Sequence, residues 1–257
     1  MKVLKHLFLA KPIFGKWDET IIWSCLEGVM GQIIVDDEKQ PKSALAKLGE
    51  KASFGFLAGI PNLDLIENCR GEDIILVPQN QKWVNLIEAN YPTQAKKFQQ
   101  YATKKDTTFD KVLLEFFVGN LPSEYTIKAI DLEIYQVCLN ENWSEDLVAN
   151  YSNYDNFKEL GLGFVAIYKG KVIAGASSYS TYRGGIEIEI DTHPAFRRKG
   201  LAKALASYLI LECLSRGLYP SWDAHTHISL KLAQKLGYEF SYSYSAYEID
   251  WTIKEKS

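Results

Sequence analysis

The chain lacks the cysteine pattern of a disulfide-bonded or zinc-bound domain. Four cysteines are spread over 257 residues and none forms a CxxC pair, so neither a zinc knuckle nor a disulfide framework is indicated. This use of cysteine fits a reducing, cytoplasmic setting. Cys213 falls within a predicted long helix and is expected to be a small buried residue. Asp36 and Asp37 are adjacent acids on a polar loop, where such pairs are usually solvated, so no metal is expected.

Long apolar runs and an excess of positive charge are also absent. Lys5, His6 and Lys11-Pro12 interrupt the N-terminal stretch too early for a signal-peptide core. No run approaches the roughly 20 apolar residues of a membrane-spanning helix. The net charge is −3 and the pI is about 5.9, whereas a general nucleic-acid binder needs a broad basic surface. We therefore expect a soluble cytoplasmic protein with neither membrane nor nucleic acid as a partner.

One stretch, residues 185–216, predicts a strand, a tight connection and a long helix. Residues 186–191 alternate between isoleucine and an acid, as in a strand with one apolar face. His193-Pro194 ends the strand, because proline has no N–H to donate. Residues 197–202 then lead into an apolar-periodic helix, which ends at Gly217.

The connection has the properties of a phosphate-binding loop. A helix N-terminus presents unpaired N–H groups and a partial positive charge, and Gly200 lets a phosphate approach the backbone closely. Arg197, Arg198 and Lys199 add full positive charges. The alternative is a solvated basic turn that only caps an ordinary helix. The strand directly upstream, with its acidic face, favours the binding loop.

At this point the stretch resembles a known family. The pattern Arg197-x-x-Gly200-x-Ala202, after a strand and a short connection with proline, resembles the acetyl-CoA pyrophosphate loop of the GNAT acyltransferases. Further segments, in chain order, are similar to one GNAT subgroup, the zwittermicin-resistance type. Those segments are 163–167, 177–180, 222–224 and 232–238, with 26–28, 35–37 and 41–44 in the N-terminal part. The resemblance covers most of the chain.

The resemblance implies acetyl-CoA as co-substrate. It places the pyrophosphate on residues 197–202 and the pantetheine arm beside the backbone of Ile190 and Thr192. Ser229, near the start of a later helix, could donate to the sulfur or to the pantetheine. The cofactor-binding residues predicted in this way are Ile190, Thr192, Arg197, Arg198, Lys199, Gly200, Leu201, Ala202, Thr226 and Ser229.

Acyl transfer to an amine also needs a group that removes a proton from the amine. Glu187, Glu189 and Asp191 recur at every second position and so project from one face, roughly 6.6–7 Å apart. Crowding of like charges raises the pKa of at least one carboxyl toward a useful value. Glu187 and Glu189, nearer the strand centre, are the predicted catalytic residues. The alternative is that this face is merely exposed to solvent.

Two positions depart from the family pattern. Many GNAT enzymes carry a Tyr near the thioester sulfur, where this chain has Ala233. Many also carry an Asn at the start of the same helix, where it has Thr226. The group that protonates the leaving thiolate is therefore left open. The candidates are His225, His227, Ser229, Tyr179 and Tyr182.

The predicted fold class is α/β (α+β). A GNAT domain over residues 123–257 has a mixed, mostly antiparallel central sheet flanked by helices. A smaller α/β domain over residues 1–122 precedes it, and the break at 119–122 sets the boundary. The first domain is either a degenerate relative of the second or a platform for substrate and packing.

Several element predictions can be tested directly. Thr20–Cys25 and Gln32–Val35 are β-rich and predict two strands, Pro41 predicts the start of a helix that ends at Gly49, and the polar residues 93–105 predict a helix. The tyrosine-rich residues 238–251 predict one or two edge strands, which could pair with a second copy in a homodimer.

Two functions of different classes remain open at this point. The first is an acetyl-CoA-dependent N-acetyltransferase acting on the amine of a small molecule, of amino-polyol or antibiotic-like type. The second is a CoA-binding sensor or scaffold without turnover, which the missing Tyr at position 233 favours. Acetylation of a protein N-terminus or lysine is a weaker third option.

Overall fold

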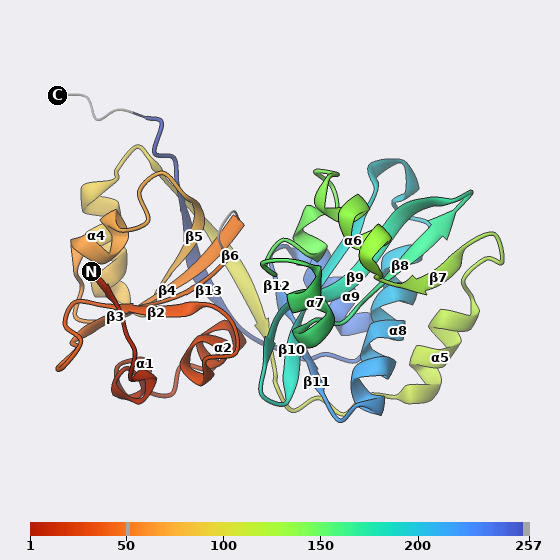
Figure 1. The fold of residues 1–257 in the computed structure, drawn as a ribbon, viewed down its shortest axis with the longest axis horizontal. Coiled ribbons are helices and arrows are strands. Elements are labelled where there is room, and N and C mark those ends of the chain that lie inside the picture. Colours follow the sequence, from red (N-terminus) through yellow and green to blue (C-terminus); the bar gives the residue numbers. More distant parts are fainter. Residues whose placement is uncertain (50–51, 254–257) are drawn as a thin grey trace. The chain divides into compact units, whose positions relative to one another are not determined.

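The computed structural model describes residues 1–49 and 52–253. The chain forms two compact units, shown in Figure 1: Met1–Gln100 with the segment from Tyr244 onward, and Tyr101–Ser243. The fold class is the predicted mixed α/β type, with sheets flanked by helices.

The predicted boundary near residue 122 falls inside the second unit. The break at 119–122 follows helix α5 (Lys111–Gly119), which begins at the cap residue Asp110. This helix packs against α8 (Leu201–Ser215) of the C-terminal half, and Leu114 of α5 is fully buried in their shared core. Because α5 is held by that core, the compact units divide at residues 100 and 101 instead.

The first unit is built on a sheet with the strand order β1-β2-β3-β4-β5-β13-β6, in which β6 is Ala95–Thr103. Helices α3 and α4 share a core with this sheet that includes Ile34, Leu45 and Trp83, while α2 packs against β2 and β3. Its strands are β1 (Lys2–Val3), β2 (Gln32–Val35), β3 (Ser43–Leu48), β4 (Ala52–Gly59), β5 (Asp73–Pro78) and β13 (Phe240–Ile249). Its helices are η1 (Leu7–Leu9), α1 (Lys11–Phe14), α2 (Thr20–Glu27), α3 (Leu63–Glu67) and α4 (Gln81–Asn90).

Three element predictions in this region are wrong. Thr20–Cys25 is helical, as part of α2, because the helix buries Ile21 and Ile22 and ends at Gly28, whose φ of 67° suits a left-handed cap. Residues 43–48 form strand β3 and not a helix, since all six are buried between β2 and β4. Residues 95–103 form strand β6 (Ala95–Thr103), which buries Ala102 and Thr103. Tertiary burial overrides local propensity in each case.

The second unit holds a five-stranded sheet of order β11-β10-β9-β8-β7. Helix α8 covers one face of this sheet and shares its core with Ile186 and Ile188. The short helix η2 and helix α6 pack against β9. The strands are β7 (Thr126–Ala129), β8 (Gly163–Tyr168), β9 (Lys171–Tyr182), β10 (Gly185–Thr192), β11 (Tyr219–Ser221) and β12 (Asp223–Ala224). The remaining helices are α6 (Leu132–Leu139), η2 (Glu145–Leu147), α7 (Tyr154–Leu160), η3 (Pro194–Phe196) and α9 (His227–Lys235).

The tyrosine-rich C-terminal stretch is not an edge strand. Strand β13 lies between β5 and β6 in the sheet order, and Tyr247 is fully buried, with its register partner Leu76 on β5. Its pairing with β5 covers Tyr247 and Glu248, where no ladder is free for a second copy. The predicted edge strand is therefore wrong at these two residues, and pairing of this stretch with a second copy stays a prediction.

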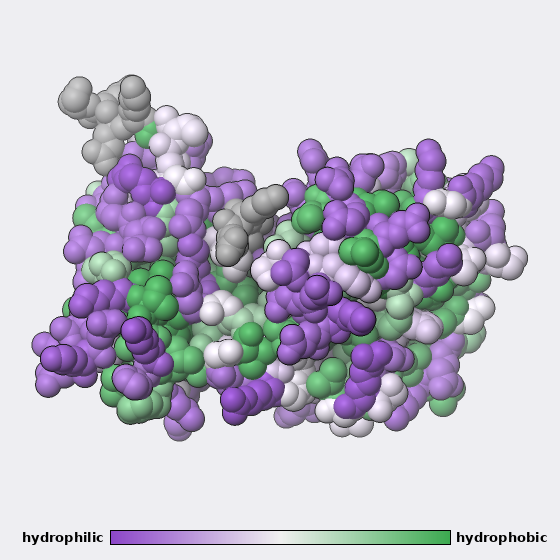
Figure 2. All heavy atoms as spheres, in the orientation of Figure 1, coloured by the Kyte–Doolittle hydropathy of each residue, from purple (hydrophilic) through white to green (hydrophobic). Residues whose placement is uncertain are grey.

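Hydrophilic side chains cover most of the face seen in Figure 2. No helix in the described part of the chain is both long and apolar enough to cross a membrane. All four cysteines are free and buried, as expected for Cys213.

Candidate active site

The candidate site lies along strand β10, one edge of which is only partly paired. It pairs antiparallel with β9 along its whole length but parallel with β11 only over Gly185–Glu187. After Ser221 the chain turns into β12, which pairs with β6. Among residues 1–49 and 52–253, no strand pairs with Ile188–Thr192 on that side. We call this segment the open edge.

The ladder with β9 fixes which backbone groups face the open edge. The His193 N–H donates to the Ile173 carbonyl at 2.9 Å, and groups alternate in direction along an antiparallel strand. The N–H and C=O of Ile190 and Thr192 therefore point to the open edge. Two side chains of the protein form hydrogen bonds with these backbone groups. Glu189 Oε1 accepts a hydrogen bond from the Ile190 N–H at 2.9 Å, and Arg197 Nε donates to the Thr192 carbonyl at 3.2 Å.

The open edge leads into the basic loop at the start of α8. Arg197, Arg198, Lys199 and Gly200 are all exposed. Arg198 and Gly200 have positive φ angles of 62° and 83°, and a Cβ built on Gly200 would meet no atom within 4 Å. The loop is therefore open around Gly200, and the backbone conformation at that position favours glycine.

The first turn of α8 follows directly on this open loop. Its first intrahelical bond runs from the Ala204 N–H to the Gly200 carbonyl at 3.1 Å, so the earlier N–H groups of the helix have no intrahelical acceptor. Leu201 is 1% exposed and anchors the turn in the core, which leaves only its backbone for a ligand. Exposed cations around a helix N-terminus fit an anionic, phosphate-bearing group.

Four carboxylates, those of Glu187, Glu189, Asp191 and Asp146, gather on the opposite side of β10 from α8. Burial raises the pKa of Glu189 to about 8, and the negative charges of Asp191 and Asp146 add to this effect, while the hydrogen bond from Ile190 opposes it. The pKa of Asp191 rises to about 7 through burial and the charge of Asp146, and the Arg197 guanidinium opposes this rise. A carboxyl with a pKa near neutrality can exchange protons at physiological pH.

Asp146, which sequence reasoning missed, comes from η2. The Ser177 hydroxyl donates to the Leu147 carbonyl at 2.7 Å, and the Leu147 side chain fills the space above Gly175. Since Ser177 and Gly175 are the register partners of Glu189 and Asp191, η2 lies over the acidic face of the sheet.

One signal for Asp146 was present in the sequence. Residues 129–157 contain no Lys, Arg or His, so the helical segment that covers the acidic face is itself acidic. Its six acids are Asp131, Glu133, Glu141, Glu145, Asp146 and Asp155.

The two predicted catalytic carboxylates lie in different surroundings. Glu187 is 6% exposed, and its register partners on the two neighbouring strands, Ser180 and Ser221, are fully buried. Glu189 is half-buried. Of the two, Glu189 is the better placed to reach an amine that approaches from solvent.

Two of the predicted residues at the start of α9, Thr226 and Ser229, make local hydrogen bonds. Thr226 Oγ1 caps this helix by accepting the Ser229 N–H at 3.1 Å, and Ser229 Oγ accepts the indole N–H of Trp222 at 3.0 Å. His227 Nε2 lies 3.0 Å from the Tyr101 hydroxyl. Ala233 is fully buried. Its methyl side chain supplies no hydroxyl or other proton donor at the position where many relatives have Tyr.

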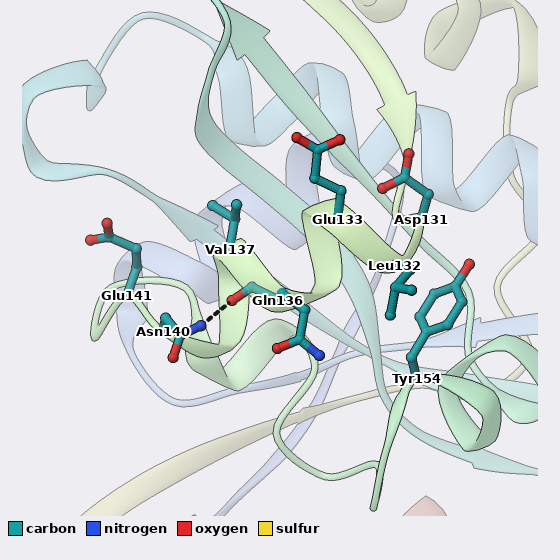
Figure 3. A pocket seen from close by; sticks show the side chains of 8 residues that line it. All are labelled: Asp131, Leu132, Glu133, Gln136, Val137, Asn140, Glu141 and Tyr154. Carbon is teal, nitrogen blue, oxygen red and sulfur yellow. Dashed lines mark hydrogen bonds between the residues drawn. The ribbon is translucent and has the colours of Figure 1, made fainter.

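A hollow of about 900 Å³ lies on the outer side of α6 (Figure 3). Asp131 and Glu133 line it together with Tyr154 and the apolar Val137, and the Asn140 side chain is tied to the Gln136 carbonyl at 2.8 Å. The acidic residues that line the hollow continue the acidic surface of residues 129–157 from η2 to the outer side of α6.

No group of three or more His, Cys, Asp or Glu side chains in the described residues is arranged to hold a metal ion. Asp36 Oδ1 accepts hydrogen bonds from the Lys42 and Ser43 N–H groups, and Asp37 Oδ1 from those of Lys39 and Gln40. Both acids therefore serve the turn between β2 and β3.

Comparisons with known proteins identify the family of the chain. The chain is similar to a GCN5-related N-acetyltransferase-like protein from Streptococcus suis 89/1591, whose crystal structure shows 55% identity and a TM-score of 0.94 over 96% of this chain and 99% of that one. It is 24% identical to YdfB of Bacillus subtilis (strain 168), an uncharacterized N-acetyltransferase, over 95% of both proteins. A tandem GNAT protein from the clavulanic acid biosynthesis pathway shares the fold, with a TM-score of 0.52 and 12% identity over 87% of this chain and 84% of that one. The GNAT acetyltransferase family profile matches residues 11–247. With a profile match over nearly its whole length and a relative of the same fold at 55% identity, the chain belongs to the GNAT acetyltransferase family and is an acyltransferase.

Proposed function

We propose that this enzyme transfers an acetyl group from acetyl-CoA to the amine of a small molecule, with Glu189 as the general base. One observation carries the proposal. A half-buried carboxylate with a pKa of about 8 lies on the strand whose open edge leads into an exposed basic loop at a helix N-terminus. The acyl donor and the proton acceptor are thereby brought to one place.

The donor side rests on the loop and the open edge. Arg197, Arg198 and Lys199, with the backbone around Gly200, would hold the pyrophosphate. The outward-facing N–H and C=O groups of Ile190 and Thr192 would pair with the amides of the pantetheine arm, as a strand pairs with a neighbour. When bound, acetyl-CoA supplies a thioester that is activated toward attack by an amine.

The acceptor side rests on the acidic face. Asp146, Asp191 and Glu189 attract an ammonium group. The Glu189 carboxylate then accepts one of its protons, so that the neutral nitrogen can attack. The pKa of about 8 places Glu189 closer than an ordinary carboxyl to the proton affinity of an amine. A base whose pKa lies near the operating pH is the more efficient one.

An amino-polyol or antibiotic-like amine is the proposed acceptor class. The resemblance to zwittermicin-resistance enzymes supports it, and so does the absence of basic residues from 129–157. The structural neighbour described as a tandem GNAT protein supports the further proposal that the first unit is a second, degenerate GNAT-like unit. Because Ala233 stands where many relatives have Tyr, a CoA-binding protein without turnover is the second candidate.

Calorimetric titration of acetyl-CoA, followed by thiol release with a panel of amines, tests the proposal. We expect micromolar binding and thiol release above the rate of hydrolysis with at least one amine of more than one positive charge. Binding without amine-dependent thiol release would instead support the non-catalytic candidate. Absence of binding would overturn both.

Asp146→Asn is expected to shift the pH dependence of kcat/KM. Removing one negative charge near Glu189 lowers the pKa of that carboxyl, so the midpoint of the acidic limb should move to lower pH by about 0.5. Asp146 is exposed, so the fold should tolerate the change. Glu145→Gln, on the same turn of η2, is the matched control. An unchanged midpoint in Asp146→Asn would show that η2 does not act on the base.

A further inference from the structure

One backbone donor at the open edge, the Ile190 N–H, is already hydrogen-bonded to a side chain of the protein. This bond must break when the acyl donor binds there. Glu189 Oε1 accepts the Ile190 N–H at 2.9 Å, and this N–H faces the open edge. A backbone N–H makes one good hydrogen bond. The donor that a bound pantetheine arm would need is therefore held by the side chain proposed as the base.

We propose that Glu189 is a latch that the acyl donor releases: the donor takes the Ile190 N–H, and the freed carboxylate turns to the amine. The inference rests on the proposed function, because it takes the open edge as the binding place of the donor. No covalent step is involved. One hydrogen bond is exchanged for another, and the carboxylate then accepts a proton from the ammonium group.

The surroundings of Glu189 give this exchange a chemical consequence. Glu187 and Asp191 on the same strand and Asp146 on η2 face it with negative charge, and all three favour its protonated form. Arg197 acts on Asp191, and the buried Cys138 thiol on α6 faces Asp191 as well. The Ile190 N–H favours the charged form of Glu189. Withdrawing that N–H must therefore raise the proton affinity of the carboxylate further.

The backbone hydrogen-bond acceptor at the open edge is also held by a side chain. Arg197 Nε donates to the Thr192 carbonyl at 3.2 Å, and this carbonyl also faces the open edge. The two backbone groups that a strand-like ligand would use are thus both met by side chains of the site. Binding of the donor would release a carboxylate toward the amine and a guanidinium toward the phosphates. The site would then favour the donor as the first substrate to bind.

NMR of 15N-labelled protein tests the latch directly. In the free protein, the Ile190 amide proton should titrate with the Glu189 carboxyl, at a pH of about 8. Saturation with S-acetonyl-CoA, whose thioether cannot donate the acyl group, should abolish this titration. The same titration with and without the analogue, or none in the free protein, would overturn the latch. A structural role alone would not link the Ile190 resonance to the ligand in this way.

Binding of the same analogue to two variants separates the latch from simple charge removal. Glu189→Ala frees the Ile190 N–H, so at pH 9 we expect a Kd about 5-fold lower than that of the wild type. Glu189→Gln loses the same charge but keeps an oxygen that can accept the N–H, so its gain should be about 2-fold at most. Equal gains in the two variants would assign the effect to charge and overturn the latch. Failure of the wild type to bind the analogue would instead overturn the proposed function, and the latch with it.

Discussion

A Gly200→Asp variant is expected to bind acetyl-CoA at least about 100-fold more weakly than the wild type. The new side chain would enter the open space at the start of α8, where no atom lies within 4 Å of a Cβ at this position. It brings a negative charge to the place proposed for the pyrophosphate. Two like unit charges about 6 Å apart, at an effective dielectric constant of about 20, repel by about 2.8 kcal/mol, which corresponds to about 100-fold in Kd. Calorimetric titration measures the change.

Gly200→Asn separates the charge from the backbone effect. The φ of 83° at this position disfavours most side chains, yet Asn and Asp tolerate the left-handed region better than other residues. Both variants should therefore fold with similar melting temperatures. We expect Gly200→Asn to lose no more than about 10-fold in affinity, since it adds volume without charge. Equal losses in the two variants would mean that the loop does not bind an anionic group.

The elements of the second unit follow closely from local sequence. The alternation at residues 186–191 predicts β10, and the apolar periodicity after Gly200 predicts α8. In the first unit the same rules fail for β3, because burial on both sides of a strand removes the alternation that marks it. The six residues of β3 are all buried, and five of them are Ala, Leu or Lys, which are typical of a helix. The rules fail for α2 because a helix, and not a strand, buries the β-branched Ile21 and Ile22.

The residues of the candidate site also differ in how far the sequence predicts them. A contiguous loop such as 197–202 can be predicted, because its charges and its glycine are neighbours in the chain. Asp146 joins Glu189 through the packing of η2 on β9, and no spacing in the sequence encodes that contact. The alternation of acids predicts one acidic face, but it does not separate the buried Glu187 from the half-buried Glu189. That difference arises because β11 pairs with β10 only as far as Glu187.

Glu189→Gln is expected to lower kcat/KM for the amine by about 100- to 10,000-fold, the usual contribution of a general base. In the wild type the rate should rise about 10-fold per pH unit and level off above the pKa of Glu189, which is about 8 in the free protein and higher once the donor holds the Ile190 N–H. The variant should lose that limb and keep only the dependence due to the ionisation of the amine itself. Rates measured from pH 6 to 9.5 with one amine compare the two directly. A wild-type limb retained in the variant would assign the base to another group.

Thermal unfolding of the same variant shows whether its loss of activity comes from a loss of structure. The pKa of Glu189 is raised from its ordinary value of 4.5 to about 8 on folding. Between these pH values the folded state binds more protons than the unfolded state, so the free energy of unfolding falls as pH rises from about 4.5 to about 8. Asp191, with a pKa of about 7, acts in the same direction. Gln at position 189 removes this penalty, so the melting temperature of the variant should exceed that of the wild type at pH 9 and match it at pH 4. A variant that is slower but more stable at pH 9 is what a general base held among like charges requires.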